Sequence, residues 1–308
     1  MISILMTSFN GERFIGEQIA SLLAQTLQDF KLYIQDDKST DNTFAIVEKY
    51  AEKHPDKIHA AQNTENSGCA KLNYIRMMIA HKNDYLMLCD QDDVWLPDKI
   101  EVTLAKMREM EAKYGAKTPL LVHTDLRVVD NELETISPSF KAAMNANYEK
   151  TKLHNQVIQN TLTGCTVMYN RVLAELITEA PTFMAMHDWW LMLIASAFGE
   201  IGSLDKQTIL YRQHSENEIG AKDVRTLSYK INRVLNRAEI KEALSSTYAQ
   251  AQGFLDVFNN SLSADQKKLL EAYIDIPNHY KLARIIIVFR LGVFKNGFSR
   301  KIAQIIFI

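Results

Sequence analysis

The sequence predicts an α/β protein with a mostly parallel sheet, helices on both faces of that sheet, and a helical appendage at the C-terminus. In the first third of the chain, short β-rich runs alternate regularly with segments of helical apolar spacing. Right-handed βαβ crossovers produce this order of elements. After about residue 215 strand signals become few and helical signals dominate. We therefore expect one α/β domain at residues 1–217 and a helical region at residues 218–308.

The expected elements follow one another closely along the chain. The run ISILMTS at residues 2–8 is the first strand, and the helix after it has apolar residues at Phe14, Ile19, Leu22 and Leu23. The same analysis predicts further strands at 30–37, 57–63, 84–90 and 119–125, and helices at 39–54 and 68–81. Functional sites in such sheets lie at the carboxyl ends of the strands.

The composition is that of an ordinary globular protein, with 308 residues of which 47% are hydrophobic and 23% charged. Lys and Arg number 35 and Asp and Glu 37, so the net charge of -2 argues against a nucleic-acid partner. The cysteines Cys69, Cys89 and Cys165 are widely spaced and odd in number, which indicates reduced core residues and not a disulfide framework or a zinc site. The N-terminal run is expected to be a core strand and not a signal peptide, and no apolar stretch is long enough to span a bilayer.

Acidic residues mark the ends of several predicted strands. The second strand ends in Asp36 and Asp37, and the strand at 84–90 ends in the sequence Asp90-Gln91-Asp92-Asp93. Like charges at one sheet edge repel each other unless a cation or several hydrogen-bond donors lie among them. An Asp-x-Asp sequence after a buried strand is typical of a site for Mg2+ or Mn2+ with phosphate oxygens, although many such triplets are solvated loops or helix caps. The second acidic strand end favours the metal–diphosphate interpretation.

Six segments in this order resemble the GT-A-fold glycosyltransferases of family 2, which are inverting enzymes that use nucleotide sugars. The resemblance extends over roughly residues 1–217, and three of its segments are most similar to bacterial rhamnosyltransferases of rhamnose-polysaccharide assembly. The six segments are TSFNGERFIGEQIASLLAQT, QDDKSTDNT, CDQDDVWLPDKI, TGCTVMYNRVL, HDWW and YRQHSEN.

The resemblance implies a role for each matching residue in nucleotide binding. Thr7 and Phe9 would border the nucleobase. Asp37 would accept a hydrogen bond from the N3–H of the base, and Asp36 would support that loop. Lys71 would lie near the base and the phosphates. Two departures from the family pattern concern this part of the site. Phe9 stands where Tyr is frequent, and Lys38 stands where a small residue, often Gly, follows the Asp pair, which is costly if that loop requires a positive φ.

The resemblance also implies the residues of the reaction centre. Asp90 would lie near the ribose and the cation, Asp92 would be the direct metal ligand, and His214 would be a polar group near the diphosphate or the metal. Asp188 would be the catalytic base, although an Asp at the start of an apolar helix is also a common cap. Asp93 is expected to cap the following helix or to orient its neighbours.

Four more residues are candidates for contact with the acceptor or the donor sugar. Asp125 would bind a sugar or simply end its strand. Gly164 would let the backbone approach the sugar, or it is a plain turn glycine. Trp189 and Trp190 would form a sugar-stacking wall beside Asp188, or they fill the core.

These features predict a metal-dependent hexosyltransferase. The subgroup resemblance implies dTDP-β-L-rhamnose as donor, a lipid-linked saccharide as acceptor and a place in cell-surface polysaccharide synthesis. The alternatives are a family 2 enzyme that uses a UDP-hexose or a UDP-N-acetylhexosamine, and a non-catalytic nucleotide-sugar-binding module. A nucleotidyltransferase would present a Gly-rich basic loop after the first strand, and TSFNGERF has only one Gly and one Arg.

The C-terminal region combines apolar stripes with basic residues and has no acidic residue after Asp275. In a helix, Phe298, Ile302, Ile305 and Ile306 would share one face. The basic residues of the tail are Lys281, Arg284, Arg290, Lys295, Arg300 and Lys301, and an upstream basic face has Lys230, Arg233, Arg237 and Lys241 beside Leu227, Ile231 and Val234. Such helices suit an anionic membrane interface. We expect a cytoplasmic protein peripherally bound to the inner face of the plasma membrane; the alternatives are packing on the first domain or a homodimer interface.

Overall fold

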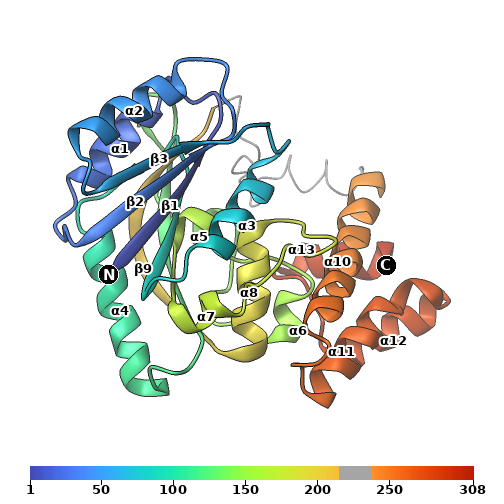
Figure 1. Ribbon diagram of the computed structural model, residues 1–308. Coiled ribbons are helices and arrows are strands. Elements are labelled where there is room, and N and C mark those ends of the chain that lie inside the picture. The colour runs from blue at the N-terminus through green and yellow to red at the C-terminus, as the bar shows by residue number, and fades with distance from the viewer. Residues whose placement is uncertain (215–236) are drawn as a thin grey trace. The chain divides into compact units, whose positions relative to one another are not determined.

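The computed structural model of the protein (Figure 1) describes residues 1–214 and 237–308. The chain divides into two compact units, each built from several stretches of sequence. The first unit comprises Met1–Phe140, Thr163–Ala180 and Gly199–Ala221, and the second comprises Lys141–Leu162, Pro181–Phe198 and Lys222–Ile308. The boundary expected between residues 217 and 218 lies outside the described residues. The second unit includes two stretches from the middle of the chain as well as the C-terminal helices.

One sheet organises the first unit. Its strands are β1 (Ile2–Ser8), β2 (Phe30–Asp36), β3 (Ile58–Gln62), β4 (Tyr85–Cys89), β5 (Val94–Trp95), β6 (Leu120–Val129), β7 (Thr135–Ser137), β8 (Val167–Asn170) and β9 (Glu200–Arg212). The order is β3-β2-β1-β4-β8-β6-β9-β5, and β7 pairs with β6. The neighbours β3, β2, β1 and β4 are parallel, as are β6 and β9. The predicted α/β fold with a mostly parallel sheet is confirmed.

The part of the sheet beyond β4 departs from the simple alternation. Strands β5, β7 and β8 pair antiparallel with their neighbours, and the sequence analysis did not predict them. The strand expected to end at Asp125 continues to Val129, and the β6–β9 register shifts on both sides of Asp125. Such an irregularity re-aims a side chain within a strand, so the polar residue does not mark the end of β6.

Helices cover both faces of the sheet in the first unit. They are α1 (Ile15–Leu23), α2 (Thr43–Lys53), α3 (Ala70–Ala80), α4 (Lys99–Tyr114), α7 (Arg171–Glu175) and the 3₁₀ turn η1 (Gly164–Thr166). Alternate residues of a strand face opposite sides. Ile2, Ile4 and Met6 of β1 join the core cluster that α1, α2 and α4 complete, whereas Leu5 is buried outside that cluster and α3 also packs on β1. Figure 1 shows α1 and α2 side by side at this sheet.

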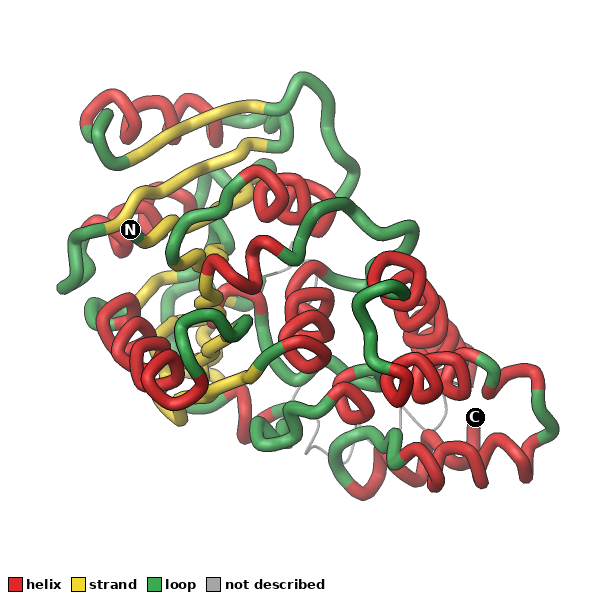
Figure 2. The backbone as a smooth tube through the Cα atoms, turned by 60° about the horizontal axis from the view of Figure 1, so that its bottom comes forward, coloured by secondary structure: helices red, strands yellow, loops and turns green. Residues whose placement is uncertain are grey.

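The described part of the second unit consists of helices and loops (Figure 2). Its helices are α6 (Leu153–Gln156), α8 (His187–Phe198), α10 (Arg237–Phe258), α11 (Ala264–Ile274), α12 (Lys281–Leu291), α13 (Phe298–Phe307) and the 3₁₀ turn η2 (Ile276–Asn278), with α5 (Phe140–Ala143) at its start. The core includes the ring of Trp190, whose centroid lies 5.4 Å from that of Phe254. The expected helical appendage is confirmed. Among the described helices, none combines the length and the apolar character needed to cross a bilayer.

Lys99, the first residue of α4, is fully buried in the first unit. Its Nζ lies 3.5 Å from Thr208 Oγ1 and 4.5 Å from the centroid of the Trp95 ring. Burial lowers the pKa of Lys99 from 10.5 to about 8, although nearby thiols and Asp93 act in the opposite direction. A protonated amine in this position therefore destabilises the folded state at neutral pH.

We expect Lys99→Met to stabilise the protein at pH 7, because methionine fills a similar volume without a charge. The folded pKa of Lys99 lies below the unfolded pKa, so the destabilisation by Lys99 is absent above pH 10.5 and grows as the pH falls from 10.5 towards about 8. The loss at pH 7 corresponds to about 3 kcal/mol. In urea unfolding, the free energy of unfolding of Lys99→Met should exceed that of the wild type at pH 7. This gain should be about 1 kcal/mol smaller at about pH 9.

The control for this measurement is Lys106→Met, on the same helix, which replaces a more exposed lysine paired with Glu109. Lys106→Met should not show a gain in the free energy of unfolding at pH 7 that shrinks at about pH 9. Equal gains for Lys99→Met at both pH values would contradict the desolvation argument.

Candidate functional site

The carboxyl ends of β1, β2 and β3 meet at the side chain of Asp36. This carboxylate is fully buried and accepts four hydrogen bonds. The donors are the Ser8 hydroxyl at 2.9 Å, the Ser39 hydroxyl and backbone N–H at 2.6 and 2.8 Å, and the Gln62 amide at 3.0 Å. Four donors occupy the acceptor positions of a carboxylate. The geometry therefore makes Asp36 a group that ties strand ends together.

Asp37, the next residue, is 5% exposed and holds the loop after β3. Its Oδ1 accepts from the Asn63 amide at 2.6 Å and from the Ser67 N–H at 2.8 Å, and its Oδ2 accepts from the Ser67 hydroxyl at 2.7 Å. An ionised carboxylate has about four acceptor positions. These three bonds leave capacity for a further donor such as the N–H of a base.

Phe9 and Gln91 lock the end of β1 to the acidic loop after β4. The Phe9 N–H donates to Gln91 Oε1 at 2.9 Å, and the Gln91 amide donates back to the Phe9 carbonyl at 3.0 Å. A Cβ on Gly11 would lie 2.3 Å from the same Oε1, so the glycine leaves room for this amide. The Phe9 ring is 45% exposed, and Thr7 is the last but one residue of β1. Lys71 lies in the first turn of α3 and is partly exposed.

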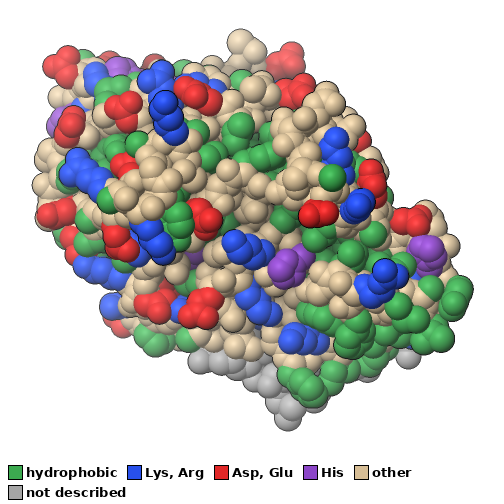
Figure 3. Space-filling model, turned by 90° about the horizontal axis from the view of Figure 1, so that it is seen from below, with side chains coloured by type: hydrophobic (Ala, Val, Ile, Leu, Met, Phe, Trp, Pro, Cys, Tyr) green, Lys and Arg blue, Asp and Glu red, His purple; other side chains and the backbone are tan. Residues whose placement is uncertain are grey.

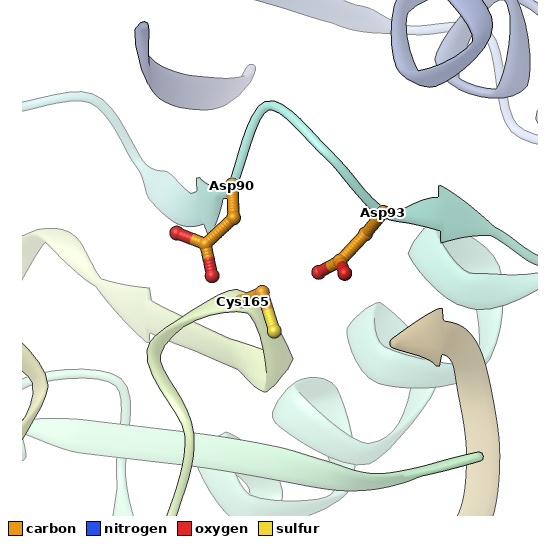
Figure 4. Close-up of side chains that lie close together, drawn as sticks. All are labelled: Asp90, Asp93 and Cys165. Carbon is orange, nitrogen blue, oxygen red and sulfur yellow. The ribbon is translucent and has the colours of Figure 1, made fainter. Parts of the chain in front are cut away.

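The acidic loop after β4 gathers Asp90 and Asp93 around the thiol of Cys165 (Figure 4). One ligand atom of each of these three residues lies within 4.8 Å of the others. The Tyr74 hydroxyl of α3 lies 2.9 Å from Asp90 Oδ1 and 2.6 Å from the Cys89 carbonyl. Asp90 is thus held at the strand end, between a helix on one face of the sheet and the η1 turn.

Asp93 is fully buried, and its surroundings disfavour its charge. Desolvation and the neighbouring carboxylates Asp92 and Asp90 raise its pKa well above the usual range. Its Oδ1 accepts from the Arg212 N–H at 3.1 Å, and its Oδ2 has no hydrogen-bond partner among the described residues. Asp93 does not cap the following helix, since the residue at the start of α4 is Asp98. Of the two expected roles, orientation of its neighbours is the one that the structure supports.

The end of β9 closes over the acidic loop through Arg212. This side chain is 2% exposed, and its Nε donates to the Asp92 carbonyl at 2.9 Å. Its terminal nitrogens bond the Asn131 carbonyl and the Glu17 carboxylate. His214, two residues on, places Nε2 2.7 Å from Asp92 Oδ2. The predicted metal residues Asp92 and His214 are therefore in contact, and Asp90 belongs to the same loop.

The carboxylates of this loop fit a hard divalent cation. A buried carboxylate oxygen without a partner, on Asp93, lies in a cluster of three acids whose mutual repulsion a cation would relieve. Oxygen ligands are those that Mg2+ and Mn2+ prefer. The Cys165 thiol is a poor ligand here, because burial and the adjacent acids raise its pKa well above the ordinary value and keep it protonated.

Asp125 lies within β6, and Gly164 lies next to Cys165 of the acidic cluster. Asp125 Oδ2 accepts from the Ser139 hydroxyl at 2.6 Å and from the Gln207 amide at 2.8 Å, and the residue is 2% exposed. Gly164 begins the η1 turn that also contains Cys165.

Asp188, Trp189 and Trp190 belong to α8 in the second unit. Asp188 is 7% exposed, and its Oδ1 accepts from the Trp189 N–H at 2.6 Å, which is a contact within the first helical turn. The Trp189 indole donates to the Gln156 carbonyl at 2.7 Å. Trp190 is 1% exposed and packs against Phe254. For Trp190 the structure therefore favours core packing over the proposed sugar-stacking wall, because neither face of a buried ring is open.

The sequence analysis missed Arg212, Gln91 and Tyr74 as organisers of the site. Arg212 belongs to the quoted segment YRQH, so a signal was present, but nothing in the sequence shows what it contacts. Gln91 occupies the variable position of Asp-x-Asp, and Tyr74 looks like a core residue of its helix. Each contacts a partner that is distant in sequence; Phe9 and Gln91, for example, are 82 positions apart.

Comparison with known proteins finds clear relatives. The model for the family described as "Glycosyl transferase family 2" matches residues 3–174. The chain is 27% identical over 261 residues to the dTDP-rhamnosyl transferase RfbG of Shigella flexneri, which covers 80% of this chain and 84% of that protein. It is 25% identical over 194 residues to the UDP-Glc:alpha-D-GlcNAc-diphosphoundecaprenol beta-1,3-glucosyltransferase WfgD of Escherichia coli, covering 63% and 68% of the two chains. The structure of S. aureus TarS 1-349 matches with a TM-score of 0.59 at 17% identity, over 89% of this chain and 70% of that one, and this likeness shows the shared GT-A fold.

The loop after Asp37 generates a prediction about Lys38, whose φ is +61°. A side chain with a Cβ costs on the order of 1 kcal/mol in this conformation, and the Lys38 Nζ donates to the Thr64 carbonyl at 2.6 Å on the exposed side. We expect Lys38→Gly to be more stable than Lys38→Ala by about 1 kcal/mol. Both variants lose the amine, so their difference in urea unfolding isolates the backbone strain. An alanine variant as stable as the glycine variant would show that the loop relaxes without glycine.

Proposed function

This chain belongs to glycosyl transferase family 2, and we propose that the sugar it transfers is L-rhamnose, donated by dTDP-β-L-rhamnose. The observation that supports this donor is the similarity to a dTDP-rhamnosyl transferase over four fifths of both chains. The reaction forms an α-L-rhamnoside by one displacement at the anomeric carbon, with inversion. The residues proposed below for each step are those that the first unit gathers at the carboxyl edge of its sheet and those at the start of α8.

The nucleotide would bind at the ends of β1 and β2. Asp37 retains acceptor capacity beside its three bonds to the 63–67 loop, and Thr7 and the exposed Phe9 ring lie at the end of the neighbouring strand. Asp36 positions this edge and does not itself contact the base, because four donors already occupy its carboxylate. Lys71 would supply positive charge near the phosphates.

Asp92 and Asp90, with His214, would hold Mg2+ or Mn2+. A divalent cation bound there supplies positive charge against the negative charge that develops on the departing diphosphate. The residues of this chain prepare the site. Arg212 fixes the Asp92 backbone, and His214 fixes the Asp92 carboxylate through the 2.7 Å contact. Side chains that are already ordered lose less conformational entropy when a cation binds to them.

Asp188 would be the base that accepts the proton from the attacking hydroxyl group of the acceptor. Its place in the first turn of α8 puts the carboxylate at the positive end of the helix dipole. An ionised carboxylate is the form that a base requires. Attack from the face opposite the diphosphate needs one base and no covalent intermediate, as in inverting glycoside chemistry.

The acceptor would be a lipid-linked saccharide in the synthesis of a bacterial cell-surface polysaccharide. The relative WfgD carries a diphosphoundecaprenol acceptor in its name, which supports this class of acceptor. The same relative uses UDP-glucose, so the specific second candidate is a family 2 enzyme that uses a UDP-sugar. Asp37 alone does not separate the two, since uracil and thymine present the same N3–H.

The donor panel is the experiment that tests this proposal. The full chain is incubated with dTDP-β-L-rhamnose, UDP-glucose and UDP-N-acetylglucosamine, and release of nucleoside diphosphate is measured with and without a membrane extract as source of acceptor. We expect turnover with dTDP-rhamnose to exceed that with either UDP-sugar by at least tenfold. Preference for a UDP-sugar would replace the proposed donor, and binding of every donor without turnover would favour the binding-module alternative.

The same assay tests the cation. EDTA should abolish release of nucleoside diphosphate, and Mg2+ or Mn2+ should restore it. Asp92→Asn keeps the shape of the side chain but removes its charge, so it should require far more metal for half-maximal rate. Full activity of the wild type in EDTA would refute the metal assignment.

Asp188→Asn should lower the turnover rate by about 10²–10⁴-fold, the usual contribution of a general base. The amide keeps the shape of the side chain at the start of α8, so donor affinity measured by calorimetry should stay near that of the wild type. Asp265→Asn is the matched control, because Asp265 also lies in the first turn of a helix of the second unit, α11. It should lose only the dipole interaction, which is worth about 0.3–1 kcal/mol of stability. Equal rates for both variants would make Asp188 a helix-start residue and leave the base unassigned.

A further inference from the structure

The C-terminal hairpin, defined as residues 280–307 with α12 and α13, concentrates the exposed apolar side chains of the molecule. Among the described residues, seven of the twelve exposed large hydrophobic side chains lie in it. They are Tyr280 at 73% exposure, Leu282 at 62%, Ile286 at 49%, Phe289 at 63%, Phe298 at 80%, Ile302 at 44% and Ile306 at 49%. An exposed apolar patch of this kind marks an interaction site, whereas scattered single residues do not.

Helix α13 buries its polar side and exposes its apolar side, which is the reverse of an ordinary helix that packs on a core. Its buried residues are Arg300, Ala303 and Gln304. Arg300 bonds the Met144 carbonyl, and the Gln304 amide bonds the Val293 carbonyl at 2.7 Å and the Lys295 N–H at 2.9 Å. The polar side chains are thus used inside the second unit. The apolar side predicted from the sequence, with Phe298, Ile302 and Ile306 on it, faces outward.

Specific contacts join the start of α12 to the end of α13. The Lys281 amine at the start of α12 donates to the Ile306 carbonyl near the end of α13 at 2.8 Å. In the connection between the helices, the ring centroid of Phe294 lies 5.0 Å from that of Phe289 and 5.7 Å from the Lys301 Nζ. Gly292, with a φ of +67°, allows the chain to leave α12. The exposed apolar side chains of the two helices therefore belong to neighbouring elements.

The charge of the hairpin has one sign. No acidic residue follows Asp275, and Lys281, Arg290 and Lys301 are exposed beside the apolar residues. The second unit adds Lys150, whose pKa is lowered by burial and by the nearby charge of Lys301. Figure 3 shows hydrophobic side chains gathered with Lys and Arg side chains towards the lower right of that face. Long basic side chains at the margin of an apolar surface can extend to anionic groups while their stems stay on that surface.

We propose that the C-terminal hairpin docks on an anionic phospholipid surface, with its apolar side chains at the boundary of the acyl chains and its basic side chains at the head groups. A second copy of the chain is a poorer occupant. A two-fold interface would place the same patch against itself, and so would set Lys281, Arg290 and Lys301 against a surface of the same sign. The proposal does not depend on the donor sugar or on catalysis.

The upstream basic face does not contribute to this argument. Most of its residues lie outside the described part of the chain, namely Leu227, Lys230, Ile231, Arg233 and Val234. Lys241 is exposed on α10, but its neighbours in the predicted face are not described. The proposal therefore rests on the hairpin alone.

Co-sedimentation with vesicles tests the proposal on the full chain without nucleotide. Vesicles of phosphatidylcholine are compared with vesicles that contain equal parts of phosphatidylcholine and phosphatidylglycerol. We expect binding to the anionic vesicles only. Raising the salt from 0.1 M to 1 M shortens the screening length from about 10 Å to about 3 Å, so binding should weaken strongly.

Two triple variants separate charge from apolar contact. Lys281→Gln, Arg290→Gln and Lys301→Gln together should weaken binding on the order of a hundredfold, because each basic residue near such a surface contributes about fivefold. Phe289→Ser, Phe298→Ser and Ile302→Ser together should remove the binding that remains at high salt. The matched control is Tyr114→Ser with Ile136→Ser, which removes two exposed apolar residues of the first unit and should leave binding unchanged.

Thermal melting checks that the variants are folded, and sedimentation velocity measures their oligomeric state. The proposal is overturned if the intact protein ignores anionic vesicles, or if the control variant loses as much binding as the serine variant. A wild-type dimer that the serine variant converts to monomer, without vesicle binding by either, would identify the hairpin as a contact between copies. Because no step involves donor or acceptor, vesicle binding can fail while rhamnosyl transfer stands, and the reverse.

Discussion

The acidic edge of the sheet depends on a buried arginine. Asp90, Asp92 and Asp93 occupy one loop, and concentrated like charge in a partly desolvated place is unfavourable. The Arg212 guanidinium bonds the Asp92 carbonyl and the Asn131 carbonyl from a position that is 2% exposed. Its backbone N–H bonds Asp93 as well. One residue at the end of β9 thus supplies both a positive charge and the hydrogen bonds that order the loop.

Arg212 also connects the loop to other elements of the first unit. Its guanidinium pairs with Glu17 of α1 and lies 4.6 Å from the centroid of the Phe14 ring. The centroid of the same ring lies 4.9 Å from the centroid of the His214 ring, and His214 contacts Asp92. The proposed ligands of the cation are therefore ordered by protein contacts alone. Preorganisation of this kind is the main contribution of a protein to a metal or diphosphate site.

The two units bury their apolar residues in different ways. In the first, helices cover both faces of the strands, which is why β1 is buried along its whole length and β4 is buried after its first residue. In the second, aromatic residues such as Trp190 and Phe254 form the core, while much of the apolar surface of α12 and α13 stays outside. Helix α13 buries Arg300 and Gln304 and exposes Phe298 and Ile302, which is the reverse of the usual amphipathic pattern of a helix in a water-soluble domain.

Local periodicity was enough to predict the first half of the sheet. The strand predicted at residues 2–8 is β1 itself, and the predicted runs at 30–37, 57–63 and 84–90 contain β2, β3 and β4. Their side chains and crossovers follow patterns of a few residues. The acidic strand ends and the apolar stripe of the tail could be recognised for the same reason. The strands β8 and β9 could not, because their place in the sheet depends on pairing with β4 and β6, far away in the chain.

The sequence by itself determined which residues carry charge at the sheet edge and which residues form the apolar side of α13. Only the tertiary structure decided what those residues meet. Asp93 is oriented by Arg212, which is 119 residues away in sequence, and no local pattern encodes such a partner. The apolar side of α13 points outward because Arg300 and Gln304 find carbonyl partners inside the second unit. Both outcomes depend on which contacts satisfy buried polar groups, and those contacts exist only once distant segments have packed together.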